Sequence, residues 1–298
     1  MEKVRKTKKI REKTSVSMAI LFVALTVYTI SFIVLLLWTG IVALRSSGDF
    51  SYAVKVKSWR KLLSFKGLTL DSFKNAWDNF TMPNRNGEPW TMVQMFGHAI
   101  LYAGGCSIVA TLVACLMAYV TARYDYLIGK IVYGIVLVTM AIPIVGALPS
   151  EMEMVDNLGL MDSVFGLYIL KANFLGLYFL IFHAQFKMIP KDYTEAAGID
   201  GASELRIMLQ VIFPMAIGTI TTVILLNFIA FWNDYQTPMI YWNSHPVIAY
   251  GLWYNAENNQ PVPEVLAGML LVAAPILVAF GIFNKKVMSN MSIGGVKG

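Results

Sequence analysis

The sequence predicts an all-α integral membrane protein with six transmembrane helices. Of its 298 residues, 57% are hydrophobic and only 14% are charged, a composition typical of membrane proteins. Six apolar runs are each long enough to cross roughly 30 Å of hydrocarbon as a helix, at about 1.5 Å per residue. We expect these spans at residues 17–44, 98–121, 131–149, 164–188, 215–242 and 264–283.

A basic segment precedes the first span. Residues 1–16 carry seven lysine or arginine side chains and two glutamates, so by the positive-inside rule we expect a cytoplasmic basic tail. The run at 17–44 is too long for the roughly 7–15-residue core of a signal peptide and lacks a convincing cleavage site, which favours a retained helix. A nucleic-acid-binding arm is the alternative for the tail, and the apolar remainder of the chain argues against it.

The connecting segments orient the other spans. Residues 45–97 form a long polar connection that we expect to be extracytoplasmic, since loops of this length weigh little in charge counts. The segment 122–130 carries basic residues and should be cytoplasmic, whereas 150–163 and 243–263 have acids and no lysine or arginine and should be outside. The basic tail at 284–298 returns to the cytoplasm. We therefore expect a multi-pass protein of the cytoplasmic membrane with both termini inside.

Prolines interrupt three of the predicted spans. Pro143 and Pro149 lie in the third, Pro238 in the fifth and Pro275 in the sixth. Neighbouring groups or a water-filled cavity must satisfy the backbone that such residues free. They favour a bundle that bends around a path, and a simple packing kink is the open alternative for each of them.

No enzymatic site is indicated. The sequence lacks a G-x-x-x-x-G-K-[ST] P-loop, so we expect no ATP binding by this chain. His98, His183 and His245 are dispersed without metal-ligand spacing, which favours hydrogen-bonded or interfacial histidines. Cys106 and Cys115 lie nine residues apart in one apolar run, so we expect neither a disulfide nor a metal site. We therefore expect no catalytic residue, no metal and no cofactor on this chain.

The most informative stretch is the polar segment 189–214, between the fourth and fifth spans. Ile189, Tyr193, Ala196 and Ala197 recur at helical spacing opposite charged side chains, which predicts a short amphipathic helix with its apolar face toward the bundle.

Two glycines, Gly198 and Gly201, interrupt this pattern. Asp200 or Ser203 can cap a second helix, whose apolar stripe ends at Pro214. We expect a helix-turn-helix finger at the membrane surface, with its charged side toward the cytoplasm. On amphipathicity alone, an ordinary interfacial loop is the alternative.

The residues of this finger resemble the EAA signature of permease subunits in binding-protein-dependent ABC importers. That signature reads E-A-A, three residues, G, nine residues, I, one residue, L-P, and here valine and phenylalanine replace isoleucine and leucine. The matching positions are Glu195, Ala196, Ala197, Gly201, Val211, Phe213 and Pro214. The neighbouring segment 199–203, which includes Asp200, looks like the version found in carbohydrate importers.

The resemblance covers roughly residues 15–298 and implies a type I ABC importer permease-like bundle with cytoplasmic coupling helices. In that family the finger docks in a cleft of the ATPase subunit, which assigns ATPase coupling to Glu195, Ala196, Ala197, Asp200, Gly201 and Pro214. The C-terminal Gly294, Gly295 and Lys297 resemble the maltose-type tail that inserts between the ATPases. Within residues 98–283 the resemblance implies a five-helix permease core.

The fifth span carries the other polar cluster of the interior. Asn227, Trp232, Asn233 and Asp234 combine amides, a carboxylate and an aromatic ring, groups that suit a sugar on a solute pathway. The alternative is an aromatic belt at the outer end of the span.

The outer loop before the last span is polar and aromatic. The resemblance implies that such a loop contacts the extracytoplasmic solute-binding protein, here through Trp253, Tyr254, Asn258 and Asn259. A simple cap on the bundle is the alternative.

Together these features predict half of the pore of an ATP-driven importer of a carbohydrate, an oligosaccharide or a similar polar solute. The implied partners are a second permease, two ATPase subunits that hold ATP and Mg²⁺, and the binding protein. An ion-coupled secondary transporter that uses Asp234 is the alternative, but it would need further intramembrane ionisable groups and usually an internal repeat.

Overall fold

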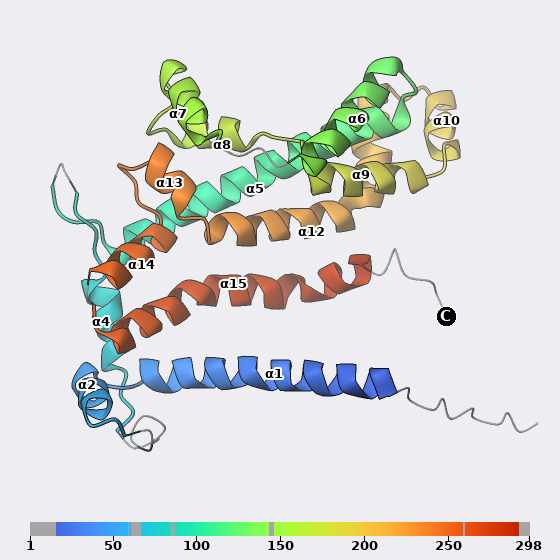
Figure 1. Ribbon diagram of the computed structural model, residues 1–298. Helices are drawn as coiled ribbons and strands as arrows, with labels where there is room; N and C mark the ends of the chain where they lie inside the picture. Colours follow the sequence, from blue (N-terminus) through green and yellow to red (C-terminus); the bar gives the residue numbers. More distant parts are fainter. Residues whose placement is uncertain are drawn as a thin grey trace, which may run out of the picture.

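The computed structural model describes residues 16–58, 60, 67–84, 87–142, 146–258 and 260–291, with the side chains described up to residue 282. Within these ranges the chain is helical, and its β-type pairing consists of two isolated bridges. Four helical segments are long and apolar enough to cross a membrane: Ser17–Ala43, Met92–Arg123, Glu204–Trp232 and Val262–Ile282. They run lengthwise through the molecule (Figure 1).

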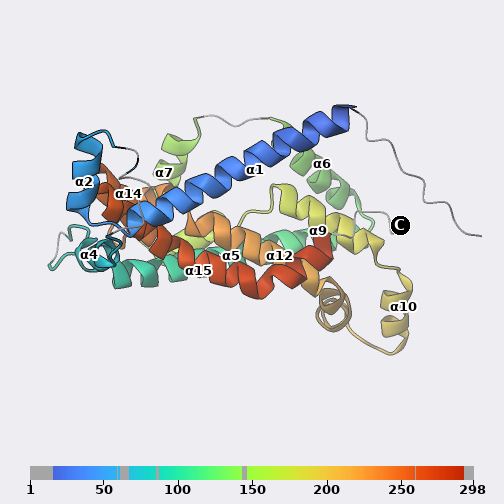
Figure 2. The ribbon, with the colours of Figure 1, turned by 90° about the horizontal axis from the view of Figure 1, so that it is seen from below.

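The first predicted span is a single helix, α1 (Val16–Ala43). The side chains of residues 17–37 are exposed on every side of the helix, and α1 meets the rest of the chain chiefly through α15 (Val262–Met291). Figures 1 and 2 show it at the periphery of the bundle. Such a continuous apolar surface needs lipid or another chain around it. We therefore describe α1 as a candidate membrane-spanning helix at the edge of the bundle.

The second span begins earlier than residue 98. α5 (Met92–Arg123) starts at a capping box, in which the Thr91 hydroxyl accepts from the N–H of Gln94 and the Gln94 side chain accepts from the N–H of Thr91. The preceding connection therefore ends at Thr91 and not at 97. Its described part includes the short helices α2 (Ser47–Lys55) and α4 (Asp71–Asn79).

The third predicted span, 131–149, is wrong in its bounds. α6 (Leu127–Ala141) stops before Pro143 because Ile142, the residue in front of the proline, adopts the extended backbone that this position favours. Pro149 does not kink a span but lies in the first turn of a separate helix, α7 (Leu148–Asn157).

The fourth predicted span, 164–188, is divided into α8 (Val164–Lys171) and α9 (Leu177–Met188). The side-chain oxygen of Asn173 accepts a hydrogen bond from the N–H of Leu175. This bond takes the place of the backbone hydrogen bond that the N–H of Leu175 would make in a helix. It stabilises the non-helical backbone at 172–176, which is largely exposed.

The predicted finger consists of one short helix and a turn. After α10 (Asp192–Ile199), three segments continue as one helix: α11 (Glu204–Ile207), the π-helical turn η1 (Met208–Ile212) and α12 (Phe213–Trp232). The expected second finger helix is therefore the start of the fifth span. The π-helical turn precedes Pro214, which has no N–H to donate to it.

The last two spans also differ from the prediction at their ends. α12 stops at Trp232 and not at 242, and α13 (Gln236–Tyr241), which contains Pro238, and α14 (Ile248–Glu257) follow it. α15 continues past 283 to Met291, so the predicted tail at 284–298 begins as helix.

Two apolar clusters pack the helices together. One includes Phe80, Trp232 and Ile248, and the other includes Phe186 and Ile212. Figures 1 and 2 show α2, α4 and α14 at one end of the bundle and α10 at the other, and α1 starts and α15 ends at the α10 end. The start of α1 and the end of α15 therefore lie at the same end of the bundle, as an even number of membrane crossings requires.

We predict that Gly268→Ala destabilises the bundle and that Gly281→Ala, on the same helix, does not. A Cβ at 268 would lie 2.3 Å from the Phe80 ring, which is only 1% exposed and so has no free space to move into, whereas a Cβ at 281 meets nothing within 4 Å. Overpacking of this kind costs about 1–3 kcal/mol. The thermal midpoint of the detergent-purified chain measures the difference, and equal midpoints would contradict the prediction.

Candidate functional site

The Glu195 segment lies on α10, at one end of the bundle (Figure 1). None of the α10 residues is buried, and the side chain of Ile199 is 87% exposed. The expectation that Tyr193 and Ala196 face the bundle is wrong, since both are exposed, whereas Ile189 is buried as expected. Ile199 is thus an exposed apolar side chain beside charged residues.

Gly201 ends α10 in a left-handed conformation, with φ +77°. The N–H of Gly201 donates to the carbonyl of Gly198, and the N–H of Ala202 donates to the carbonyl of Ala197. This pair of bonds is a Schellman motif. A Cβ at Gly201 would meet nothing within 4 Å, so the backbone conformation explains the glycine and crowding does not. Asp200 precedes it as the C-cap residue.

Arg123, at the end of α5, holds the start of α10. Its guanidinium donates to the carbonyl of Ile189 at 2.8 Å and to the hydroxyl of Thr194 at 2.9 Å. The neighbouring Tyr124 hydroxyl donates to the Glu204 carboxylate at 2.5 Å. α5 is therefore bonded on both sides of the turn. Sequence reasoning used Arg123 only for topology, and its place directly after an apolar run was the signal for a helix-end anchor.

A cavity of 250 Å³ lies under the turn. Glu195, Gly198 and Ala202 line it together with residues from the end of α5. Glu195, Ala196, Ala197, Asp200 and Gly201 thus form one local surface with this cavity behind it. Pro214 is exposed on the following long helix and does not line the cavity.

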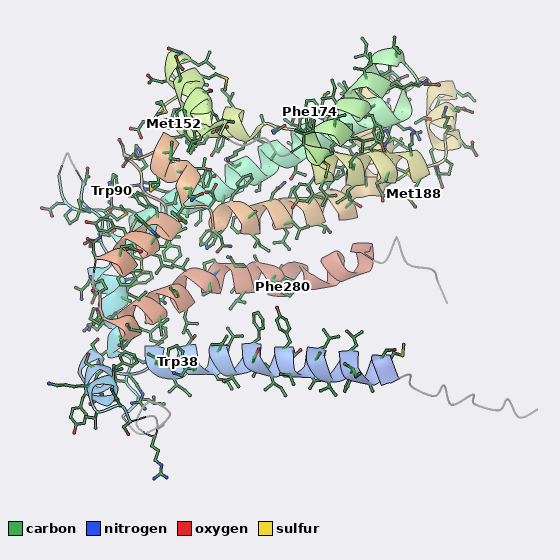
Figure 3. All side chains as sticks on the ribbon, viewed as in Figure 1. Trp38, Trp90, Met152, Phe174, Met188 and Phe280 are labelled. Carbon is green, nitrogen blue, oxygen red and sulfur yellow. The ribbon has the colours of Figure 1, made fainter. Side chains whose placement is uncertain are left out.

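A second cavity, of 310 Å³, lies where α8 and α9 separate. Figure 3 labels Phe174 in this break. The amide of Asn227 on α12 faces the cavity and donates to the Thr111 hydroxyl on α5 at 3.0 Å. The other lining residues are Ala110, Ala114, Glu151, Leu170, Lys171, Asn173, Phe174, Leu175, Gly176, Tyr178, Phe179 and Phe231. Amides, two opposite charges and aromatic faces are suited to a polar solute.

The other predicted pathway residues lie elsewhere. Trp232 is 1% exposed and donates its indole N–H to the carbonyl of Val272 on α15, so it is a packing residue. The Asn233 amide is exposed and donates back to the carbonyl of Ile229. None of Trp232, Asn233 and Asp234 lines the 310 Å³ cavity, because α12 ends at Trp232 and the next residues leave the helix.

Asp234 is held by two donors. Its carboxylate accepts from the Tyr102 hydroxyl at 2.7 Å and from the N–H of Thr237 at 3.0 Å. The Lys171 ammonium donates to the Thr237 hydroxyl at 3.1 Å. Sequence reasoning missed Lys171 and Asn173, although a lysine and an asparagine inside a predicted span were a usable signal.

The predicted binding-protein contacts lie at the end of the bundle opposite α10 (Figure 1). Trp253, on α14, is exposed and stacks on Tyr235 with ring centroids 5.8 Å apart. Asn258 is exposed, and its side-chain amide donates to the backbone carbonyl of Tyr254. Tyr254 itself is partly buried. Asn259 lies outside the described residues, as do Gly294, Gly295 and Lys297.

Known proteins resemble this chain over most of its length. The melibiose/raffinose/stachyose import permease protein MelC of Bacillus subtilis (strain 168) is 24% identical over 262 residues, which cover 86% of this chain and 88% of that protein. The trehalose transport system permease protein SugB of Mycobacterium tuberculosis (strain CDC 1551 / Oshkosh) is 27% identical, over 68% of this chain and 78% of its own.

The fold also has a solved counterpart. A chain in the crystal structure of a bacterial ABC transporter involved in the import of the acidic polysaccharide alginate superposes with a TM-score of 0.68 at 20% identity, covering 92% of this chain and 98% of that chain. Residues 110–287 match the family model described as "Binding-protein-dependent transport system inner membrane component". This range contains the α10 surface and every residue that lines the 310 Å³ cavity. The chain, a multi-pass membrane protein, belongs to that family.

Proposed function

We propose that this chain forms half of the translocation pore of an ATP-driven importer that takes up a carbohydrate, an oligosaccharide or a similar polar solute. The family description supports the dependence on a binding protein. The name of MelC refers to melibiose, raffinose and stachyose and that of SugB to trehalose, and these names support a carbohydrate. A second permease would complete the pore.

The α10 surface carries the proposal. Its Ile199 side chain projects into solvent while Arg123 and the Gly201 turn fix the backbone around it. A rigid, exposed apolar surface with Glu195 beside it is suited to docking on a separate subunit. Because the sequence has no P-loop, the ATP and Mg²⁺ that drive transport belong to two partner ATPases.

The structure also offers a route from α10 to the solute cavity. Arg123, which bonds the start of α10, is the last residue of α5, and the Gly201 turn leads directly into the continuous helix that includes α12. α5 contributes Ala110 and Ala114 to the cavity, and α12 contributes Asn227. Closure of the ATPases would move α10, and two stiff helices would carry that movement to the cavity walls, as alternating access requires.

The ion-coupled alternative is less well supported. It assigns proton transfer to Asp234, but this carboxylate accepts hydrogen bonds from Tyr102 and from the backbone of Thr237 and is absent from the cavity lining. These contacts are those of a structural carboxylate at the start of α13.

We predict that Glu195→Lys and Ile199→Ser abolish ATP-driven uptake by the assembled importer while leaving the chain inserted in the membrane. The first change reverses the charge at one position of the docking surface, and the second removes the exposed apolar side chain of Ile199. Copurification of the ATPase and uptake into proteoliposomes are the measurements, and we expect a loss of tenfold or more in both. Leu158→Ser, an equally apolar exposed position at the other end of the bundle, is the control. Wild-type uptake by Glu195→Lys would overturn the coupling role.

We also predict that Asn227→Ala raises KM for the transported sugar whereas Asn233→Ala does not. Asn227 lines the cavity and Asn233 does not. The two variants therefore differ in where the asparagine is lost and not in the type of side chain removed. Loss of one hydrogen bond corresponds to about 1 kcal/mol, or roughly fivefold in KM. Uptake kinetics with the sugar found by screening wild-type proteoliposomes give the answer, and thermal midpoints check that both variants are folded. Equal KM values for the two variants would contradict the cavity assignment.

A further inference from the structure

A basic cavity lies beside the α10 anchor and has no part in the proposed solute path. It measures 580 Å³ and is enclosed by the end of α5, the start of α6 and the end of α9, which gather at one end of the bundle (Figure 1). Its lining residues are Thr121, Ala122, Arg123, Tyr124, Asp125, Tyr126, Gly129, Lys130, Tyr133, His183, Lys187, Ile189 and Lys191.

Positive charge dominates this cavity. Four lysine or arginine side chains line it, against one carboxylate, that of Asp125. Asp125 pairs with Lys130 at 2.8 Å, and this bond, with weaker contributions from Lys191 and Lys187, lowers the pKa of the Asp125 carboxyl. One carboxylate therefore lies within the field of three ammonium groups. Among the described residues Lys187 and Lys191 have no ion pair of their own, which leaves cationic donors for an anion.

The neutral part of the lining adds further donors. Tyr126 and Tyr133 carry hydroxyls, and the imidazole of His183 packs on the ring of Tyr133 with centroids 4.6 Å apart. Ammonium, guanidinium and phenol groups in one cavity can bond several oxygens of the same anion. A phosphate group matches this set, because it offers several acceptor oxygens and negative charge.

The surroundings of the cavity are apolar and exposed. Leu127 and Ile128, at the start of α6, are 73% and 64% exposed, and Ile131, Ile135 and Val138 continue the exposed apolar surface along the helix. Met188, labelled in Figure 3 at the end of α9, is exposed on the other side. Cationic and aromatic groups at the end of an apolar helix surface are the arrangement expected where headgroups meet acyl chains.

We propose that this cavity binds the phosphate of an anionic phospholipid headgroup, with the acyl chains along the exposed face of α6. The shared chemistry is phosphate recognition, and the continuous apolar surface of α6 favours the lipid over a soluble phosphate. Because Arg123 both lines the cavity and bonds the start of α10, the bound lipid contacts the anchor of the coupling surface. Placement in the cytoplasmic leaflet rests on the proposed function, but lipid binding by the chain requires no ATPase.

The test is lipid binding by the full chain, purified in mild detergent and titrated with phosphatidylglycerol or phosphatidylcholine under native mass spectrometry. We expect retention of phosphatidylglycerol over phosphatidylcholine, and a loss of roughly 10- to 30-fold in apparent affinity for phosphatidylglycerol in Lys187→Gln/Lys191→Gln. Lys187→Arg/Lys191→Arg should restore binding, since it keeps the charge. Lys55→Gln/Lys74→Gln removes two exposed lysines at the opposite end and should bind as wild type.

Three outcomes would overturn the proposal. Equal affinity of the wild type for both lipids would remove the role of the headgroup charge, and equal loss in both glutamine pairs would show a non-specific charge effect. Displacement of phosphatidylglycerol by millimolar inorganic phosphate would assign the cavity to a soluble phosphate compound. Because no ATPase or sugar is involved, these outcomes are independent of the uptake experiments on Glu195 and Asn227.

Discussion

In hydrocarbon each backbone N–H and C=O must be bonded within the protein, since an unbonded group costs several kcal/mol. This constraint explains why the described chain is helical and why side chains bond the backbone N–H groups where two of its helices break. The Asn173 side chain does so at 172–176, and the Asp234 carboxylate does so where α12 gives way to α13. The first of these breaks opens the 310 Å³ cavity, so the irregular backbone lies where a solute would need polar contacts.

The same constraint makes the remaining helices stiff, and this stiffness connects the two ends of the molecule. A turn fixed by one left-handed glycine leads into a helix that continues from Glu204 to Trp232. Arg123 bonds the other side of that turn to α5. A displacement at α10 therefore has two routes into the bundle: the chain itself through the Gly201 turn, and the hydrogen bonds of Arg123. The polar α10 segment is thus bonded to two long helices of the apolar core of this chain.

Hydrophobicity predicted which stretches are apolar and largely helical, but it could not locate where the helices break. α1 was predicted almost to the residue, because a long apolar run with a basic flank permits few alternatives. The start of α5 depends on the Thr91–Gln94 pair, and the division of the fourth span depends on the Asx turn at Asn173. Both are local hydrogen-bond effects that averaged hydropathy does not detect.

The 310 Å³ cavity was missed for the same reason. Asn227 was selected by its polarity, whereas Lys171 and Asn173 face the cavity only because the backbone opens beside them. Trp232 was predicted to line the pathway but lies in the core. The carbonyl of Val272 accepts a hydrogen bond from its indole N–H, so the side chain needs no polar solute.

The peripheral position of α1 bears on how the protein is made. Its chief helix partner is α15, so a helix that is synthesised early packs against one that is synthesised much later. At roughly 5–20 residues per second, synthesis of the chain between them takes on the order of ten seconds or more. Throughout that interval α1 has only lipid, or another membrane protein, around its apolar surface. Completion of the bundle is therefore a late event in biogenesis, and a chaperone or insertase that shields a single helix would act on this one.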